Sequence, residues 1–112
     1  MKKIEAVIRE EQLPLVRKAL EDVGYPGITI SQVRGHGRQK GVTQTWRGRE
    51  FTVDLLNKAK LELIVSDADA QRIAQTIAEN ARTGAVGDGK IWISSIETII
   101  RVRTGETGDV AI

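Results

Sequence analysis

The sequence has 112 residues and a formal net charge of +2, with 40% hydrophobic and 29% charged residues. This balance is typical of one folded globular domain, and so small a charge does not indicate general nucleic-acid binding. The absence of cysteine excludes disulfides and thiolate metal sites, and His36 as the sole histidine argues against a zinc site. No signal peptide or membrane-spanning apolar run is recognisable, so we expect a cytoplasmic protein.

The first half of the chain is expected to form a strand, a helix and a second strand. Alternating apolar residues predict a strand over 4–8. Helical spacing from 13 to 23, with Pro14 in the first turn and Gly24 just beyond, predicts a helix. β-Branched residues favour a strand over 28–34.

The second half is expected to repeat this order. A strand is predicted over 61–65, then a helix capped by Ser66 or Asp67 and ended by Gly84. A strand over 90–96 and a short extended segment over 97–103 follow, and the tail is polar. The helix should bury one apolar stripe, made of Ala70, Ile73, Ala74, Ile77 and Ala81. Two such halves predict a ferredoxin-like α+β sandwich, a βαββαβ fold in which two helices cover one face of a four-stranded antiparallel sheet.

A long connection over 35–57 separates the two halves and has no sustained apolar period. Loops of this length are usually functional or disordered. Trp46, Arg47 and Phe51 are residue types that anchor interfaces. We interpret the connection as a mobile loop that orders on a partner, with a plain solvated basic hairpin as the alternative.

A glycine-rich stretch over 84–90 matches the G-x-x-x-x-G-K spacing of a phosphate loop. It is not a Walker loop, because Ile91 stands where a Ser or Thr would hold magnesium and because a helix precedes it. Glycines still allow backbone N–H groups to form an anion nest, and Lys90 adds a charge. Arg101 and Arg103, two apart in the expected extended segment, would share one face and suit polyphosphate. The alternative is a simple turn beside a solvated basic strand.

Four stretches together resemble the PII nitrogen-regulatory signal transduction proteins, over essentially the whole chain. The stretches are GHGRQKG at 35–41, WRGREF at 46–51, RTG at 82–84 with GDGKI at 87–91, and RVRTGE at 101–106. The resemblance implies a homotrimer of single domains spanning 1–112, with ATP or ADP in each cleft between subunits. The family's T-loop, B-loop and C-terminal loop would correspond to about 36–56, 82–90 and 101–112.

The resemblance also implies a function in nitrogen regulation rather than an enzyme activity. Such a protein senses ATP, ADP and 2-oxoglutarate, and acts on an ammonium transporter or glutamine synthetase through its T-loop. It would bind no nucleic acid and would meet a membrane only through a transporter. A Mg²⁺ ion bridging the ATP phosphates to the chelating 2-oxo acid group would account for the missing Walker Ser or Thr.

Site residues follow from the resemblance position by position. The nucleotide would contact Thr29, Gly37, Arg38, Ile64, Gly87, Asp88, Gly89 and Lys90, together with Arg101 and Arg103 from the neighbouring subunit. The effector 2-oxoglutarate would contact Gln39, Lys40, Gly41 and Lys58, with Gln39 also holding Mg²⁺. Partner proteins would contact Trp46, Arg47 and Phe51.

The sequence departs from the family at its modification sites. The nucleotidylated tyrosine of the family falls at Phe51, and a serine phosphorylated in some relatives falls at Arg49. We therefore expect a switch driven by ligands alone. Two alternatives stay open: an energy-charge sensor that ignores 2-oxoglutarate, and an RNA-binding module, for which only Trp92 could stack bases from a predicted strand. Trp92 is more simply interpreted as a core or interface residue.

Overall fold

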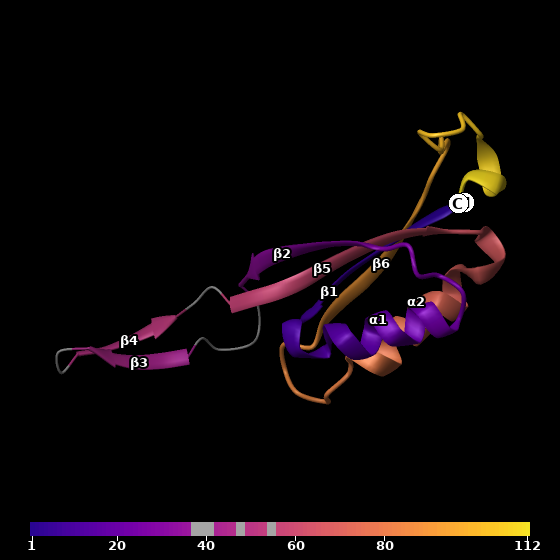
Figure 1. The fold of residues 1–112 in the computed structure, drawn as a ribbon. Coiled ribbons are helices and arrows are strands. Elements are labelled where there is room, and N and C mark those ends of the chain that lie inside the picture. The colour runs from indigo at the N-terminus through magenta and orange to yellow at the C-terminus, as the bar shows by residue number, and fades with distance from the viewer. Residues whose placement is uncertain (37–41, 47–48, 54–55) are drawn as a thin grey trace.

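The fold is a four-stranded antiparallel sheet with both long helices on one face (Figure 1). The computed structural model describes residues 1–36, 42–46, 49–53 and 56–112, with side chains outside 37–55. The sheet has the order β2 (Thr29–Gly35), β5 (Leu56–Val65), β1 (Lys2–Arg9) and β6 (Gly89–Ser95). The helices are α1 (Leu13–Asp22) and α2 (Ala70–Ala81). The predicted ferredoxin-like α+β architecture is thereby confirmed.

The core lies between the sheet and the helices, where the predicted alternation places it. Ile4, Ala6 and Ile8 of β1 are buried, and so are Leu61, Leu63 and Val65 of β5. The helices contribute Val16, Leu20, Ile73 and Ile77. The opposite face of the sheet carries no helix, and there Glu5 lies 2.7 Å from Lys3 and 3.3 Å from Lys60.

The connection between β2 and β5 contains a hairpin that the absence of an apolar period did not reveal. β3 (Val42–Trp46) pairs with β4 (Arg49–Val53) in a separate two-stranded sheet, which projects beyond the ends of β2 and β5 (Figure 1). Backbone hydrogen bonds join the two strands of a hairpin, so a hairpin does not require a sustained apolar period.

The ends of α2 differ from the predicted ones. A short 3₁₀ turn, η2 (Asp67–Asp69), precedes the helix, and Ser66 at its start makes no side-chain capping bond. The helix then ends at Ala81 because Arg82 is already extended. Gly84 therefore does not end the helix, and its positive φ of 90° serves the following loop.

The segment after β6 does not form the expected extended run over 97–103. Ile100 forms a single bridge with Thr107, and the chain between them turns back on itself. The 3₁₀ turn η3 (Gly108–Ala111) follows this bridge, and a further one, η1 (Glu10–Gln12), precedes α1. In the described part of the chain, no helix is long and apolar enough to cross a membrane.

Candidate functional site

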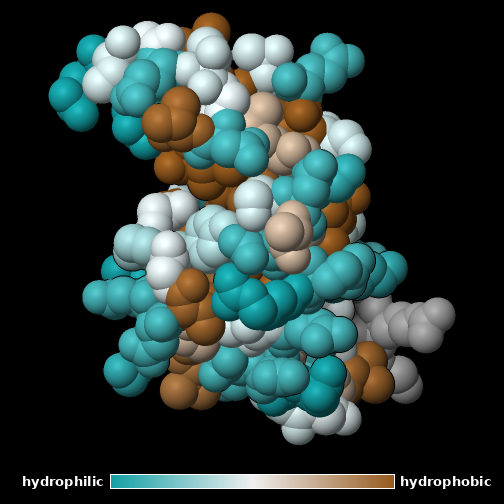
Figure 2. All heavy atoms as spheres, turned by 90° about the vertical axis from the view of Figure 1, so that its right-hand side faces the viewer, coloured by the Kyte–Doolittle hydropathy of each residue, from teal (hydrophilic) through white to brown (hydrophobic). Residues whose placement is uncertain are grey.

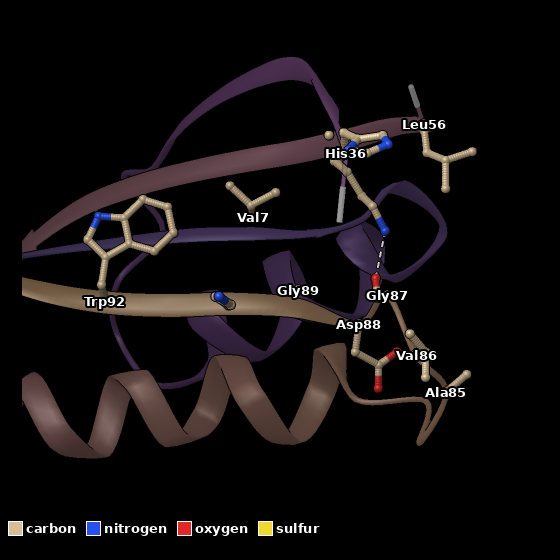
Figure 3. Close-up of a pocket in the computed structure, with 12 residues that line it drawn as sticks. Val7, His36, Leu56, Ala85, Val86, Gly87, Asp88, Gly89 and Trp92 are labelled. Carbon is tan, nitrogen blue, oxygen red and sulfur yellow. Dashed lines mark hydrogen bonds between the residues drawn. The ribbon is translucent and has the colours of Figure 1, made fainter. Parts of the chain in front are cut away.

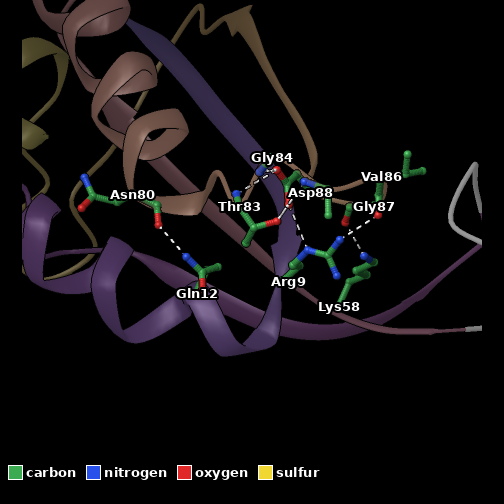
Figure 4. A network of polar contacts seen from close by, with 10 residues as sticks. Arg9, Gln12, Lys58, Asn80, Thr83, Gly84, Val86, Gly87 and Asp88 are labelled. Carbon is green, nitrogen blue, oxygen red and sulfur yellow. Dashed lines mark hydrogen bonds and ion pairs between the residues drawn. The ribbon is translucent and has the colours of Figure 1, made fainter.

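The loop between α2 and β6 is organised by the carboxylate of Asp88 (Figure 4). This carboxylate accepts hydrogen bonds from the N–H groups of Thr83 and Gly84, both at 2.9 Å, and from the Thr83 hydroxyl. The Thr83 hydroxyl oxygen accepts in turn from the N–H of Ala85. These bonds to the charged form, first from the Thr83 hydroxyl and then from Arg9, hold the pKa of Asp88 far below its usual range. The loop is therefore closed around the Asp88 carboxylate.

Two cations on neighbouring strands contact the same loop. Arg9 ends β1 and pairs in register with Lys58 of β5. Its Nε donates to Asp88 Oδ1 at 2.9 Å and its Nη2 to the Val86 carbonyl at 2.7 Å. Lys58 Nζ donates to the Gly87 carbonyl at 2.6 Å. Arg9 belongs to none of the motifs quoted above, and its bonding partners lie 77 and 79 positions away.

The loop and Lys58 border a cleft of about 700 Å³ on the face of the sheet that carries neither α1 nor α2 (the uncovered face; Figure 3). Its walls are the loop over 85–88, the start of β6 with Lys90 and Trp92, and side chains from β1, β5 and the end of β2. Lys58 is buried at the edge of this cleft. Burial is the main reason that its pKa is lowered, and the nearby charge of Arg9 adds to the effect.

Two glycines make the close packing around the cleft possible. A Cβ at Gly89 would lie 1.8 Å from the Val7 carbonyl oxygen, and the φ of Gly89 is +102°. A Cβ at Gly35 would lie 3.3 Å from Cγ of Lys58. The first position admits only glycine, and the second leaves room for the lysine stem to reach the loop.

The structure brings five of the predicted site residues into one cleft. Gly87, Asp88, Gly89 and Lys90 line it together with Lys58. Thr29 and Ile64 belong to the same uncovered face, since Thr29 pairs with Glu62 and Ile64 with Lys3. Ile64 is six positions from Lys58 on β5, a span of about 20 Å. Within one chain, Thr29 and Ile64 therefore lie towards the end of the sheet that is remote from Lys58.

The predicted arrangement of Arg101 and Arg103 is wrong. Arg101 lies at the start of a turn in which the Gly105 N–H donates to the Arg101 carbonyl at 2.8 Å. Its guanidinium contacts Glu106 Oε1 at 3.1 Å and the Val110 carbonyl at 2.9 Å. The left-handed φ of +73° at Gly105 makes this tight turn possible, so the two arginines do not share a strand face. Whether they reach a neighbouring subunit's nucleotide stays a prediction.

Several predicted positions lie outside the described residues or side chains. Gly37, Arg38, Gln39, Lys40, Gly41 and Arg47 belong to the first group, and the side chains of Trp46 and Phe51 to the second. The described residues contain no cluster of three or more acidic or histidine side chains that could hold a metal. The role of Gln39 as a Mg²⁺ ligand stays a prediction, because Gln39 lies outside the described residues.

The structure is a ferredoxin-like domain in which two lysines and a glycine-rich loop line one cleft. The model of the family described as "Nitrogen regulatory protein P-II" matches residues 1–106. The chain is 48% identical to nitrogen regulatory protein P-II 2 of Methanothermobacter thermautotrophicus, covering all of this chain and 97% of the relative. It is 49% identical to the P-II proteins of Rhizobium meliloti and Rhodospirillum rubrum, over the full length of both chains in each case.

The chain belongs to the P-II family of nitrogen regulatory proteins, as the resemblance predicted. Its function is therefore signal transduction in nitrogen regulation rather than enzymatic catalysis.

Proposed function

We propose that this P-II protein binds ATP or ADP, with Mg²⁺, and binds 2-oxoglutarate when Mg-ATP is present. One observation carries the proposal: Lys58 Nζ lies 2.6 Å from the carbonyl oxygen of Gly87. The residue assigned to the effector and the loop assigned to the phosphates therefore touch, although 29 positions separate them. A ligand bound at either site would therefore change the surroundings of the other site.

The chemistry of the cleft fits these ligands. Lys90 and Lys58 supply positive charge on opposite walls, and the glycine-rich loop supplies backbone N–H groups for phosphate oxygens. The ammonium of Lys58 is a charged donor of the kind that forms charge-assisted hydrogen bonds with a carboxylate, which suits 2-oxoglutarate. Gln39 would hold Mg²⁺, which would supply positive charge that favours binding of the dianionic 2-oxoglutarate beside the nucleotide phosphates.

The same proposal includes assembly as a homotrimer through the uncovered sheet face and the C-terminal segment. On the uncovered sheet face, Trp92 is 41% exposed. In the C-terminal segment, Ile100, Val102 and Val110 are 61%, 98% and 59% exposed. Figure 2 shows apolar side chains gathered mainly in the upper half of one face, where this segment lies. Such surfaces are typical of interfaces, and Trp92 is accordingly an interface residue rather than a core residue.

The proposed partner protein is an ammonium transporter or glutamine synthetase. Residues 36–56 would contact it, with Trp46, Arg47 and Phe51 as the anchoring side chains. Ligands at Gln39 to Gly41 would reorder the base of this segment and so change partner affinity. Phe51 has no hydroxyl and Arg49 is not a serine, so we propose that this switch works without modification at either position. Intact-mass analysis of the protein from nitrogen-starved cells should show no nucleotidyl or phosphoryl adduct on this segment.

Calorimetric titration of 2-oxoglutarate tests the proposed sensor. We expect binding in the presence of Mg-ATP, and little or none with Mg-ADP or without nucleotide. Replacing Lys58 by methionine removes a charge-assisted contact and should weaken 2-oxoglutarate binding by about thirtyfold. Lys18→Met is the matched control, because the Lys18 side chain is 77% exposed on α1. Nucleotide binding without any response to 2-oxoglutarate would leave an energy-charge sensor, and no binding of either ligand would contradict the proposal.

A further inference from the structure

We infer that Arg9 is a positioning residue that fixes the orientation of the backbone N–H groups of Gly87 and Asp88 in the loop that lines the ligand cleft. The inference rests on the proposed nucleotide function of that cleft. It concerns a residue that no motif singled out, and it assigns to Arg9 a role distinct from contact with the ligand.

Arg9 and Lys58 each bind a backbone carbonyl of the loop. Arg9 Nη2 lies 2.7 Å from the carbonyl oxygen of Val86, and Lys58 Nζ lies 2.6 Å from that of Gly87. Arg9 and Lys58 face each other across the β1–β5 ladder, so two consecutive carbonyls of the loop are held by adjacent cations (Figure 4). The peptide units of the loop cannot rotate freely while both bonds persist.

Peptide planarity then fixes the direction of the N–H groups. The described peptide bonds include no cis bond, and in a trans peptide the carbonyl and the N–H point in opposite directions. The Val86 carbonyl shares its peptide unit with the Gly87 N–H, and the Gly87 carbonyl shares its unit with the Asp88 N–H. Holding both carbonyls on the cations therefore turns two successive N–H groups away from them, which is the arrangement of an anion nest.

Arg9 is suited to this role by its second bond. Its Nε donates to Asp88 Oδ1 at 2.9 Å, and the same carboxylate accepts from the N–H groups of Thr83 and Gly84. The planar guanidinium therefore joins the closed start of the loop to the Val86 carbonyl in one rigid unit. A lysine ammonium is a single point donor on a flexible stem and cannot hold both partners in this fixed geometry.

The test compares Arg9→Met, Arg9→Lys and Arg17→Met in the full-length protein. Arg17 is exposed on α1, so its variant controls for the loss of one arginine charge. Dissociation constants for Mg-ATP and Mg-ADP are measured by calorimetry, with far-UV circular dichroism to confirm equal folding. We expect Arg9→Met to weaken both nucleotides by about tenfold with an unchanged ratio, and Arg9→Lys by about threefold. Arg17→Met should bind like the wild type.

The outcomes separate the alternatives. Unchanged affinity in Arg9→Met would overturn the inference, and so would a selective loss of ATP affinity, because it would indicate direct contact with the third phosphate. If Arg9→Met does not fold, the affinities of Arg9→Lys for Mg-ATP and Mg-ADP are used instead. An equal loss of affinity for both nucleotides supports the inference, and unchanged affinity overturns it. A wild-type protein that binds neither nucleotide would instead refute the proposed function.

Discussion

The glycine loop after α2 and the turn after β6 use the same residue types for different ends. In each, an arginine faces a carboxylate and a glycine adopts a positive φ. The Arg9–Asp88 pair joins two elements far apart in sequence, and its side chains are only 13% and 23% exposed. The Arg101–Glu106 pair joins residues of one turn, and its side chains are 37% and 39% exposed.

The difference shows how tertiary packing turns a loop into a site. The Asp88 carboxylate accepts hydrogen bonds from its own loop and from Arg9 of β1, and these bonds fix the loop against the sheet. The Arg101 guanidinium donates hydrogen bonds to Glu106 and to carbonyls near the chain's C-terminal end. The first region is fixed against β1 and β5, whereas the second is bonded only within the C-terminal segment of the single chain. Mutations in the first region should therefore lower the free energy of unfolding more than mutations in the second region.

The largest effect is expected for Gly89→Ala. The new Cβ would lie 1.8 Å from the Val7 carbonyl oxygen at a φ of +102°, so β6 must shift away from β1. We expect a loss of about 4 kcal/mol in the free energy of unfolding, measured by urea denaturation. Gly105→Ala is the matched control, since its φ is +73° but nothing lies within 4 Å of the added Cβ. Its loss should be about 1 kcal/mol, and equal losses would contradict the comparison.

An intermediate, pH-dependent effect is expected for Asp88→Asn. Asp88 has a depressed pKa in the folded state, so its stabilising contribution is present above the unfolded-state pKa of about 3.9 and is lost as the pH falls below it. The difference in unfolding free energy between wild type and Asp88→Asn should stay constant from about pH 8 to pH 5 and shrink in stronger acid. A difference that grows on acidification would contradict the assigned role of Asp88.

The smallest effect is expected for Arg101→Met. A half-exposed ion pair contributes less than about 1 kcal/mol, and the core contains none of its partners. Amide exchange should become faster over η3 (Gly108–Ala111) and stay unchanged in α1 and α2. A loss of global stability as large as that of Gly89→Ala would show that the C-terminal turn supports the core.

The sequence predicted the parts of this fold that depend on local periodicity. Alternation in β1 and the stripe on α2 identified the sheet, the helices and most of the core. The Arg101-x-Arg103 pattern failed because Gly105 and Glu106 favour a turn that spacing does not reveal. Arg9 was missed because a cation at a strand end has no local signature, and only the fold brings it to Asp88.

The most direct test of the nucleotide cleft is amide NMR of isotope-labelled protein during titration with Mg-ADP. The account predicts that the amide signals of Gly87 and Asp88 shift most strongly, because their N–H groups would bind phosphate oxygens. The amides of Gly24 and Gly27, in the turn after α1, should stay unmoved. Saturable binding of Mg-ADP that leaves Gly87 and Asp88 unshifted would contradict the account.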